Sequence, residues 1–230
     1  DYDNWVKYIE DIIKSENVQV QNILELACGT GNLTIPLTKK NYDIAGIDIS
    51  EEMLQVAREK AEKENVELVL LEQDIVELDF DVTNLDCILC GCDGFNYITY
   101  DEDLEGVFAK CHELLKENGL FIFDISSYYK LSTVLGNNMY GENRENVAYM
   151  WQNYFDDYEN LVEMDLAFFV KGEDGRFDKF EENHLQRAYK NEEIIELLKN
   201  AGFENIKTYG DFKLEAPQKD SERVFFVCKK

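Results

Sequence analysis

Basic residues are scarce in this sequence of 230 residues. Lysine and arginine together number 23, against 48 aspartates and glutamates, which gives a formal net charge of −25. Proteins bind nucleic acids largely by neutralising phosphates with Lys and Arg, so this deficit argues against a DNA or RNA partner. Small neutral or cationic ligands remain compatible with such an acidic surface, whose ordinary role is to keep a protein soluble.

Long apolar runs and a secretory leader are also missing. No apolar stretch approaches the ~20 residues of a membrane-spanning helix, and residues 1–5 contain neither a basic region nor an apolar core. We therefore expect a cytoplasmic protein with no membrane partner, present as a monomer or a dimer. A chain of this length can build the core of one α/β domain, which we expect to span residues 1–230 with one insertion.

Pairs of Cys or His at zinc spacing are absent as well. Cys87, Cys90 and Cys92 form the densest group among the six cysteines. Residues 84–90 are predicted to form a strand, on which residues three apart face opposite sides, so Cys87 and Cys90 could not easily share one ion. We expect no metal site, and free thiols rather than disulfides.

The most informative stretch is residues 22–32, where an apolar strand runs into two glycines and then into a helix. Gly29 and Gly31 allow a tight turn and the close approach of a ligand to the backbone, beside free N–H groups at the start of the helix. A nicotinamide or flavin fingerprint would have a third glycine at position 34, where this chain has Thr34. Glu25, at the end of the strand, suits a ligand with a cationic or amine-bearing end.

The rest of the chain alternates strands and helices until residue 125. Helices are predicted over residues 3–14, after the glycine turn, over 50–63 and 101–116, and from 191; strands over 42–48, 66–71, 85–90 and 120–125, with a terminal hairpin of 206–209 and 223–228. Between about residues 128 and 189 the pattern has period two and is rich in aromatics. Segments 148–154, 162–171 and 177–189 therefore predict a three-stranded antiparallel insertion that could form a lid.

The run Leu24-Glu25-Leu26-Ala27-Cys28-Gly29-Thr30-Gly31 closely resembles the first motif of class I S-adenosylmethionine-dependent methyltransferases. From residue 20 to its end the chain is similar to small-molecule members of this group with a β-sheet lid, which include glycine and amino-sugar N-methylating enzymes. The resemblance implies an α/β fold: a Rossmann-like, doubly wound, seven-stranded and mostly parallel sheet, with an antiparallel strand from the terminal hairpin and an inserted antiparallel β lid. Cys92-Asp93-Gly94-Phe95 replaces the Asn-Pro-Pro-Tyr type of motif found in enzymes that methylate base amines or protein glutamine.

The resemblance also implies how S-adenosylmethionine would be held. Asp48 lies 17 residues after Gly31 and would accept hydrogen bonds from both ribose hydroxyls, although a role at the start of the next helix is an alternative. Asp74 would take the adenine amino group and the Ile75 N–H would meet the ring, with Met53 either beside the ring or in the core. The full set of predicted cofactor residues is Glu25, Ala27, Gly29, Gly31, Asp48, Ile49, Met53, Asp74, Ile75 and Cys90.

Candidates for the acceptor side are less specific. Asp93 and Asn96 follow the strand that ends beside the transferred methyl group in the family, but turn formation would explain them equally well. His184 is a candidate proton acceptor, with packing or solvation as the alternative, and only one of His184 and Arg187 can face the pocket because they lie on opposite faces of a strand. Tyr128, Tyr129 and Trp151 could form an aromatic wall for a small amine, with packing in the core of the lid as the favoured alternative. Tyr2 or Trp5 could cover the cofactor, with core packing as the alternative for Trp5, and His112 is expected on the surface.

Methyl transfer needs mainly alignment of the acceptor and exclusion of water, so a dedicated catalytic residue is optional. The sequence thus predicts a methyltransferase that acts on a small molecule, with an amine as one candidate acceptor. Two alternatives remain. One is a non-catalytic S-adenosylmethionine-binding or interaction protein; the other, disfavoured by Thr34 and the Asp74-Ile75 pair, is an NAD-dependent oxidoreductase.

Overall fold

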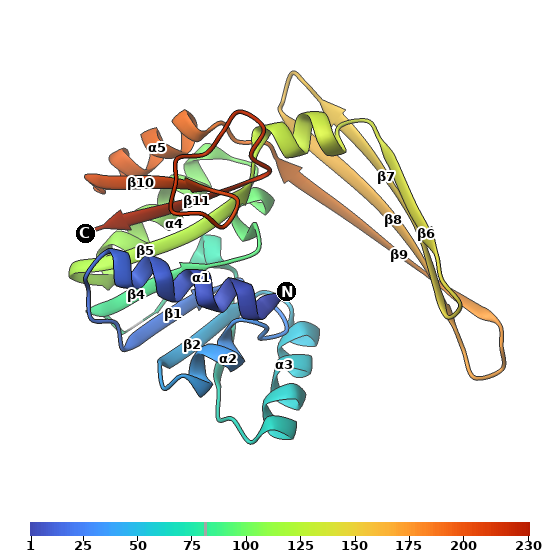
Figure 1. Cartoon of the computed structure of the whole chain (residues 1–230), viewed down its shortest axis with the longest axis horizontal. Coiled ribbons are helices and arrows are strands. Elements are labelled where there is room, and N and C mark those ends of the chain that lie inside the picture. The colour runs from blue at the N-terminus through green and yellow to red at the C-terminus, as the bar shows by residue number, and fades with distance from the viewer. Residues whose placement is uncertain (81) are drawn as a thin grey trace.

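Two β-sheets organise the chain (Figure 1), and the computed structural model describes residues 1–80 and 82–230. The seven-stranded sheet has the order β10-β11-β5-β4-β1-β2-β3. Its strands are β1 (Asn22–Leu26), β2 (Asp43–Asp48), β3 (Val69–Glu72), β4 (Leu85–Cys90), β5 (Leu115–Ser126), β10 (Asn205–Gly210) and β11 (Arg223–Lys229). A four-stranded sheet of order β6-β7-β8-β9 comprises β6 (Met139–Asn143), β7 (Val147–Asp156), β8 (Leu161–Lys171) and β9 (Phe177–Arg187).

The large sheet is mostly parallel. β1 pairs in parallel with β2 and β4, and parallel pairs also join β2 to β3 and β4 to β5. β11 runs antiparallel to both β5 and β10, so the terminal hairpin supplies the antiparallel strand. Every residue of the central strand β4 is buried, as expected for a parallel strand covered on both faces. The predicted fold class is therefore confirmed.

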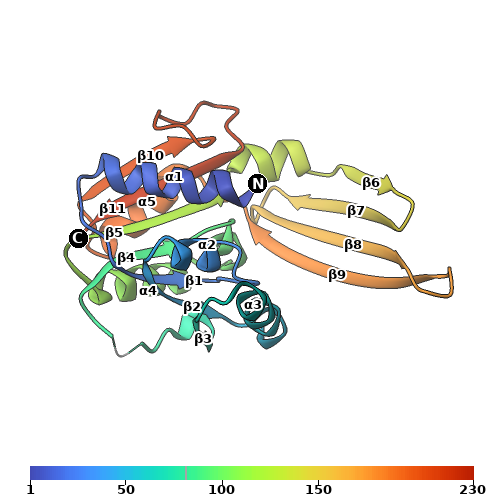
Figure 2. The same cartoon turned by 60° about the horizontal axis from the view of Figure 1, so that its bottom comes forward.

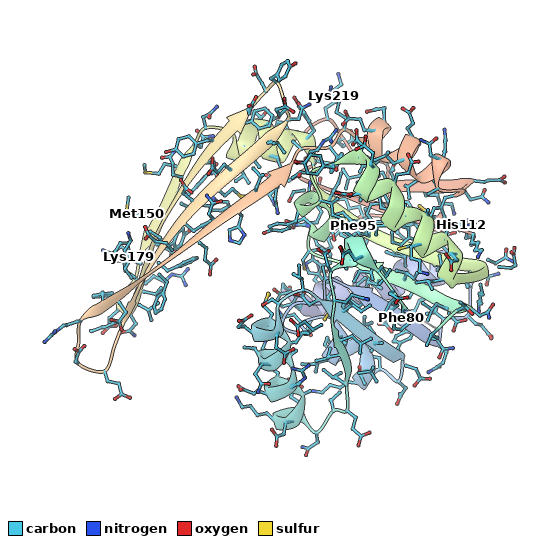
Figure 3. The ribbon with its side chains drawn as sticks, turned by 180° about the vertical axis from the view of Figure 1, so that it is seen from behind. Phe80, Phe95, His112, Met150, Lys179 and Lys219 are labelled. Atoms are coloured by element: carbon cyan, nitrogen blue, oxygen red, sulfur yellow. The ribbon has the colours of Figure 1, made fainter. Side chains whose placement is uncertain are left out.

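Helices cover both faces of this sheet. They are α1 (Tyr2–Ser15), α2 (Thr34–Lys39), α3 (Glu51–Glu64), α4 (Asp101–Leu114) and α5 (Asn191–Asn200). One core lies under α1 and α2, and a second, larger core lies under α4 and α5. Seen from behind, α4 lies in front of the sheet (Figure 3), with the labelled Phe95 on the sheet side of it. Phe95 has no exposed surface and packs edge-on against Phe108 of α4, with ring centroids 5.4 Å apart.

The insertion forms a curved sheet that projects beyond the carboxyl ends of the parallel strands (Figures 1 and 2). We call β6–β9 the lid. It has four strands rather than the predicted three, because β6 pairs with β7 along the outer edge. The missed strand reads Met-Tyr-Gly-Glu-Asn and is largely exposed, so it lacks the apolar alternation that marks a half-buried strand. A π-helical segment, η3 (Lys130–Leu135), packs under the base of the lid.

Two local predictions differ from the structure around α4. The helix ends at Leu114 rather than at residue 116, because Leu115 already pairs with Leu85 and starts β5, five residues before the predicted strand. The expectation that His112 is a surface residue holds only in part: it is partly exposed, with its ring edge-on to Phe203 at 5.0 Å between centroids.

Cys87 and Cys90 face opposite sides of β4 and belong to the two different cores. All six cysteines are free thiols. Within residues 1–80 and 82–230, no cluster of three or more His, Cys, Asp or Glu side chains is arranged to hold a metal ion. No helix in the same ranges combines the length and the hydropathy needed to cross a bilayer.

Candidate active site

A cavity of about 650 Å³ opens where β1, β2 and β4 reach their carboxyl ends, which is where ligands bind in open α/β sheets. Eight of the ten predicted cofactor residues line it: Glu25, Ala27, Gly29, Asp48, Ile49, Met53, Asp74 and Ile75. The two others do not. Cys90 has no exposed surface and its side chain packs in the core, so Gly91 and Cys92 form this part of the wall.

Gly31 does not line the cavity but lies where the loop packs against α3. A Cβ at Gly31 would lie 3.2 Å from the Cβ of Ala57 on α3, so the glycine lets the loop pack directly on that helix. Gly29, by contrast, lies in the wall, and both it and Ala27 adopt left-handed backbone conformations with φ of 54° and 52°. A conformation that an L-residue such as Ala27 rarely adopts is typical of a functional loop.

Asp48 connects the two loops that frame the cavity. Its Oδ2 accepts a hydrogen bond from the Gly29 N–H at 2.7 Å, and its Oδ1 accepts one from the Ser50 N–H at 2.9 Å. Ser50 in turn caps α3, since its hydroxyl accepts from the Met53 N–H at 3.2 Å. A carboxylate has about four acceptor sites, so these two contacts leave room for hydroxyl donors of a ligand. The helix-start role and the ribose role are therefore compatible.

Exposed apolar side chains stand beside Asp48 at the cavity. Ile49 is 65% exposed and Met53 is 42% exposed, values far from those of core residues. Both line the cavity together with Asp74 and Ile75. Asp74 caps the short helix η1 (Ile75–Glu77), its Oδ1 accepting from the Val76 N–H at 2.9 Å. Apolar walls with one carboxylate at the rim are suited to a flat, amine-bearing ring such as adenine.

Glu25 lies at the inner end of the cavity and is almost completely buried. Burial raises the pKa of this carboxyl to about 8; the negative charge of Asp48 adds to the rise, and the hydrogen bond from Thr34 opposes it. Thr34 donates from Oγ1 to Glu25 Oε2 at 2.6 Å, which gives the residue in place of a third glycine a defined role. A bound cation would offset the cost of ionising Glu25.

Asp93, predicted to contact the methyl acceptor, has other partners in the structure. It does not line the cavity, because Arg223 donates to its Oδ1 at 2.8 Å and Gln186 donates to its Oδ2 at 3.2 Å. Arg223 also forms an ion pair with the buried Asp124. Burial raises the pKa of Asp124 to about 6, and the neighbouring Arg223 limits the rise. Asp93 is thus part of a partly buried ionic cluster and is not a free base.

Asn96 is structural as well, contrary to prediction, and Arg187 is the member of the His184–Arg187 pair that does not line the cavity. Asn96 has no exposed surface; its amide donates to the carbonyls of Ser126 at 3.2 Å and Arg187 at 2.8 Å, and its Oδ1 accepts from the Ser126 N–H at 2.9 Å. Arg187 turns away from the cavity, donating to the Thr99 carbonyl at 3.0 Å and pairing with Asp101 at 3.0 Å. These contacts attach β9 to the segment that follows β4.

The proposed aromatic wall is also absent from the cavity. Tyr128 and Trp151 pack instead around the apolar cluster at the base of the lid, which includes Leu131 and Val162. Trp5 lies in a core contact with Phe225, at 5.4 Å between ring centroids. Of the two suggested cofactor covers, Tyr2 is the one that lines the cavity.

His184 of β9 reaches the cavity, so its face of the strand is the one turned towards the large sheet. Sequence reasoning missed Tyr97, Tyr100 and Asp103, which line the cavity from the connection after β4 and from the first turn of α4. Tyr97 is 49% exposed and Tyr100 is 69% exposed. Their signal in the sequence was weak: two tyrosines in a connection that follows a buried strand.

The comparisons with known proteins agree with this geometry. Residues 23–119 match the methyltransferase domain family. A protein of Geobacillus sp. (strain WCH70) that carries a methyltransferase name is 36% identical over all 230 residues, which cover 93% of its length. The crystal structure of an S-adenosylmethionine-dependent methyltransferase from Clostridium acetobutylicum ATCC 824 is 39% identical and superposes with a TM-score of 0.93, covering 100% of this chain and 92% of that one.

The chain belongs to the class I S-adenosylmethionine-dependent methyltransferases. Its cofactor is S-adenosylmethionine, and the cavity has the features that this ligand requires: exposed apolar walls at Ile49 and Met53, an acid at Asp48, and a buried acid, Glu25, suited to a cationic end. A more distant relative, the glycine/sarcosine N-methyltransferase of Aphanothece halophytica, is 27% identical over 91% of this methyltransferase and 76% of its own length.

Proposed function

We propose that this methyltransferase transfers the methyl group to the nitrogen of a small amine. The observation that carries the proposal is the charge of the cavity wall. Asp48, Asp74 and Asp103 line it as carboxylates, beside Glu25, whose raised pKa of about 8 keeps it mostly protonated at neutral pH. None of the described wall residues is Lys or Arg. Most amines are cationic near neutral pH, so such a wall attracts them and repels phosphates and carboxylates.

The contacts of Arg187 restrict the class of amine that the cavity could accept. Its guanidinium is held by Asp101 and the Thr99 carbonyl, and its side chain is only 17% exposed. It is therefore not available to bind a carboxylate beside the amine. We infer an amine without a neighbouring anionic group, which would distinguish the acceptor from the glycine in the name of the Aphanothece relative.

The cofactor contacts form the other part of the proposal. The Asp48 carboxylate would hold the ribose hydroxyls, Asp74 and the Ile75 N–H the adenine, and Glu25 the cationic methionine end. In-line displacement at a sulfonium methyl depends more on aligning the acceptor nitrogen with the methyl group than on a catalytic side chain. Such positioning can lower the barrier by about 7 to 11 kcal/mol. The cavity residues from the short helix η2 (Gly94–Tyr97) and from α4 would place the acceptor against the methyl group.

The test is formation of S-adenosylhomocysteine in a panel of amines, carboxylic acids and phenols. Methylation of amines, with no turnover of the acids, is the expected result. Turnover restricted to acids or phenols would refute the amine assignment. Binding of S-adenosylhomocysteine without turnover of any compound would instead favour the non-catalytic binding protein.

A matched pair of variants tests the charge argument. Asp103→Asn removes one carboxylate from the cavity wall, so the KM for the amine should rise while the affinity for S-adenosylhomocysteine stays unchanged. Glu102→Gln makes the same chemical change one residue away, at an exposed position outside the cavity wall, and should leave both values unchanged. An equal effect of the two substitutions on KM would show that only the overall charge matters.

A further inference from the structure

Tyr97, His184 and Glu182 form a continuous hydrogen-bonded chain at the cavity. The Tyr97 hydroxyl lies 3.2 Å from His184 Nδ1, and His184 Nε2 lies 3.2 Å from Glu182 Oε2. Tyr97 comes from η2 (Gly94–Tyr97), directly after β4, whereas His184 and Glu182 come from β9 of the lid. Tyr97 and His184 line the cavity, and the side chain of Glu182 is 56% exposed. The chain therefore connects the cavity to solvent.

The partners define the protonation of the histidine. An ionised carboxylate can only accept hydrogen bonds, so Glu182 requires a proton on Nε2. Nδ1 of neutral His184 then has a free lone pair, which accepts from the Tyr97 hydroxyl. Burial and the charge of Asp93 raise the pKa of Tyr97, so the phenol keeps a proton and can pass one on. The arrangement accepts a proton at the cavity end and holds the positive charge beside Glu182.

We propose that the Tyr97–His184–Glu182 chain is the proton acceptor for the methyl acceptor, an inference that rests on the proposed N-methylation. The acceptor's ammonium group gives one proton to the Tyr97 oxygen while the Tyr97 hydroxyl proton moves to His184 Nδ1. The freed nitrogen lone pair forms the new N–C bond to the methyl group as the C–S bond breaks and leaves its electron pair on sulfur. The products are a methylated ammonium, neutral S-adenosylhomocysteine and an imidazolium, which releases its proton to solvent on the Glu182 side.

A purely structural reading of the Tyr97–His184 contact is weaker, because other contacts already hold this end of β9. The Asn96 amide donates to the Arg187 carbonyl at 2.8 Å in partly buried surroundings, and the Tyr189 hydroxyl donates to the Ile98 carbonyl at 2.7 Å in buried surroundings. The Tyr97–His184 contact is exposed and lies next to this anchored region. Exposed hydrogen bonds of this kind contribute little to attachment, whereas access to the cavity is what proton transfer requires.

Nuclear magnetic resonance of the imidazole nitrogens tests the chain without any knowledge of the acceptor. The sequence has two histidines, so ¹⁵N-labelled His112→Gln carries His184 alone. In its complex with S-adenosylhomocysteine above neutral pH, neutral His184 should be protonated on Nε2. Glu182→Ala should convert it to a mixture of tautomers, and Glu181→Gln, on the opposite face of β9, should not. A proton on Nδ1, or a mixture already present with Glu182 intact, would overturn the proposal.

Kinetics test the proton transfer itself, with an amine that the panel above identifies. His184→Gln keeps an acceptor for the Tyr97 hydroxyl but cannot take a proton at neutral pH, so kcat should fall about 100-fold, the lower end for a general base. Added imidazole should restore part of the activity of His184→Ala. His112→Gln serves as the control with unchanged kcat. If His184→Gln and Tyr97→Phe both keep wild-type kcat, the Tyr97–His184 contact is structural and the proposal is wrong. Retained binding of S-adenosylhomocysteine by these variants shows that the cofactor site is intact.

Discussion

Replacement of Asp48 by asparagine separates the two roles of this side chain. In the proposed complex the carboxylate accepts from two ribose hydroxyls, and hydrogen bonds to a charged group contribute about 1.5 to 3 kcal/mol each. Asparagine keeps one acceptor oxygen without the charge, so we expect a loss of about 2 to 4 kcal/mol, or roughly 30- to 1,000-fold in Kd at about 1.4 kcal/mol per factor of ten.

The same substitution also affects stability. The carboxylate now binds the N–H groups of Gly29 and Ser50 at 2.7 and 2.9 Å. Because the asparagine amide has only one acceptor oxygen, one of these N–H groups would face another donor, at a cost of about 1 to 3 kcal/mol. Asp48→Ala would remove both contacts and destabilise the fold more.

Calorimetric titration with S-adenosylhomocysteine, well below the melting temperature, measures the affinity of the folded protein. Asp43→Asn is the matched control, since Asp43 is exposed at the opposite end of β2 and accepts a single side-chain hydrogen bond from Gln21 at 3.0 Å. We expect unchanged affinity in this control. Wild-type affinity in Asp48→Asn, with only the melting temperature lowered, would show that Asp48 is purely structural and would remove the ribose assignment.

Three further predictions concern other groups of the site. The raised pKa of Glu25, about 8 against an ordinary 4.5, means that the protonated form favours folding and that this stability is lost as pH rises between these values. In urea unfolding, Glu25→Gln should thus exceed the wild type in stability at pH 8 but match it near pH 4.5; a constant difference would contradict the shift. Cys92 is the one exposed cysteine of the six and lines the cavity, so S-adenosylhomocysteine should slow its labelling by a maleimide, and equal rates with and without ligand would place the ligand elsewhere. Asn96→Ala should lower the free energy of unfolding by about 3 kcal/mol or more, because it leaves several buried backbone groups unpaired, without a change in cofactor affinity; reduced affinity with wild-type stability would return Asn96 to the active site.

The cofactor side of the site was predictable because its signals are local. The strand that carries Glu25, the turn at Gly29 and the start of the helix next to residue 50 all follow from residue types within a few positions of one another. Parallel strands then bring their carboxyl ends to one edge of the sheet, so an acid at the end of β2 must lie near the turn after β1. Local pattern and sheet geometry placed the turn and Asp48 at the cavity, and the resemblance to the methyltransferase family supplied the other predicted cofactor residues that line it.

The acceptor side was not predictable in the same way, because the partners that decide it are distant in sequence. Asp93 and Arg223 are 130 residues apart, and Asn96 and Arg187 are 91 apart. A polar residue after a strand end has the same appearance whether it faces a ligand or a buried partner. The ionic partner of Asp93 is Arg223 of β11, and no residue near position 93 in the sequence predicts this pairing. Only the tertiary structure distinguishes the two cases.

The misplaced candidates nevertheless explain why His184 reaches the cavity. Asn96 holds the Arg187 carbonyl, and Asp93 holds the Gln186 side chain, so both fasten the end of β9 to the connection after β4. Successive residues of a strand alternate between its faces, so fastening Gln186 turns His184, two residues earlier, to the same side. Tyr97, one residue after Asn96, is thereby brought against the ring that it contacts. Asp93 and Asn96, first expected to touch the acceptor, thus set the positions of Tyr97 and His184, which line the cavity.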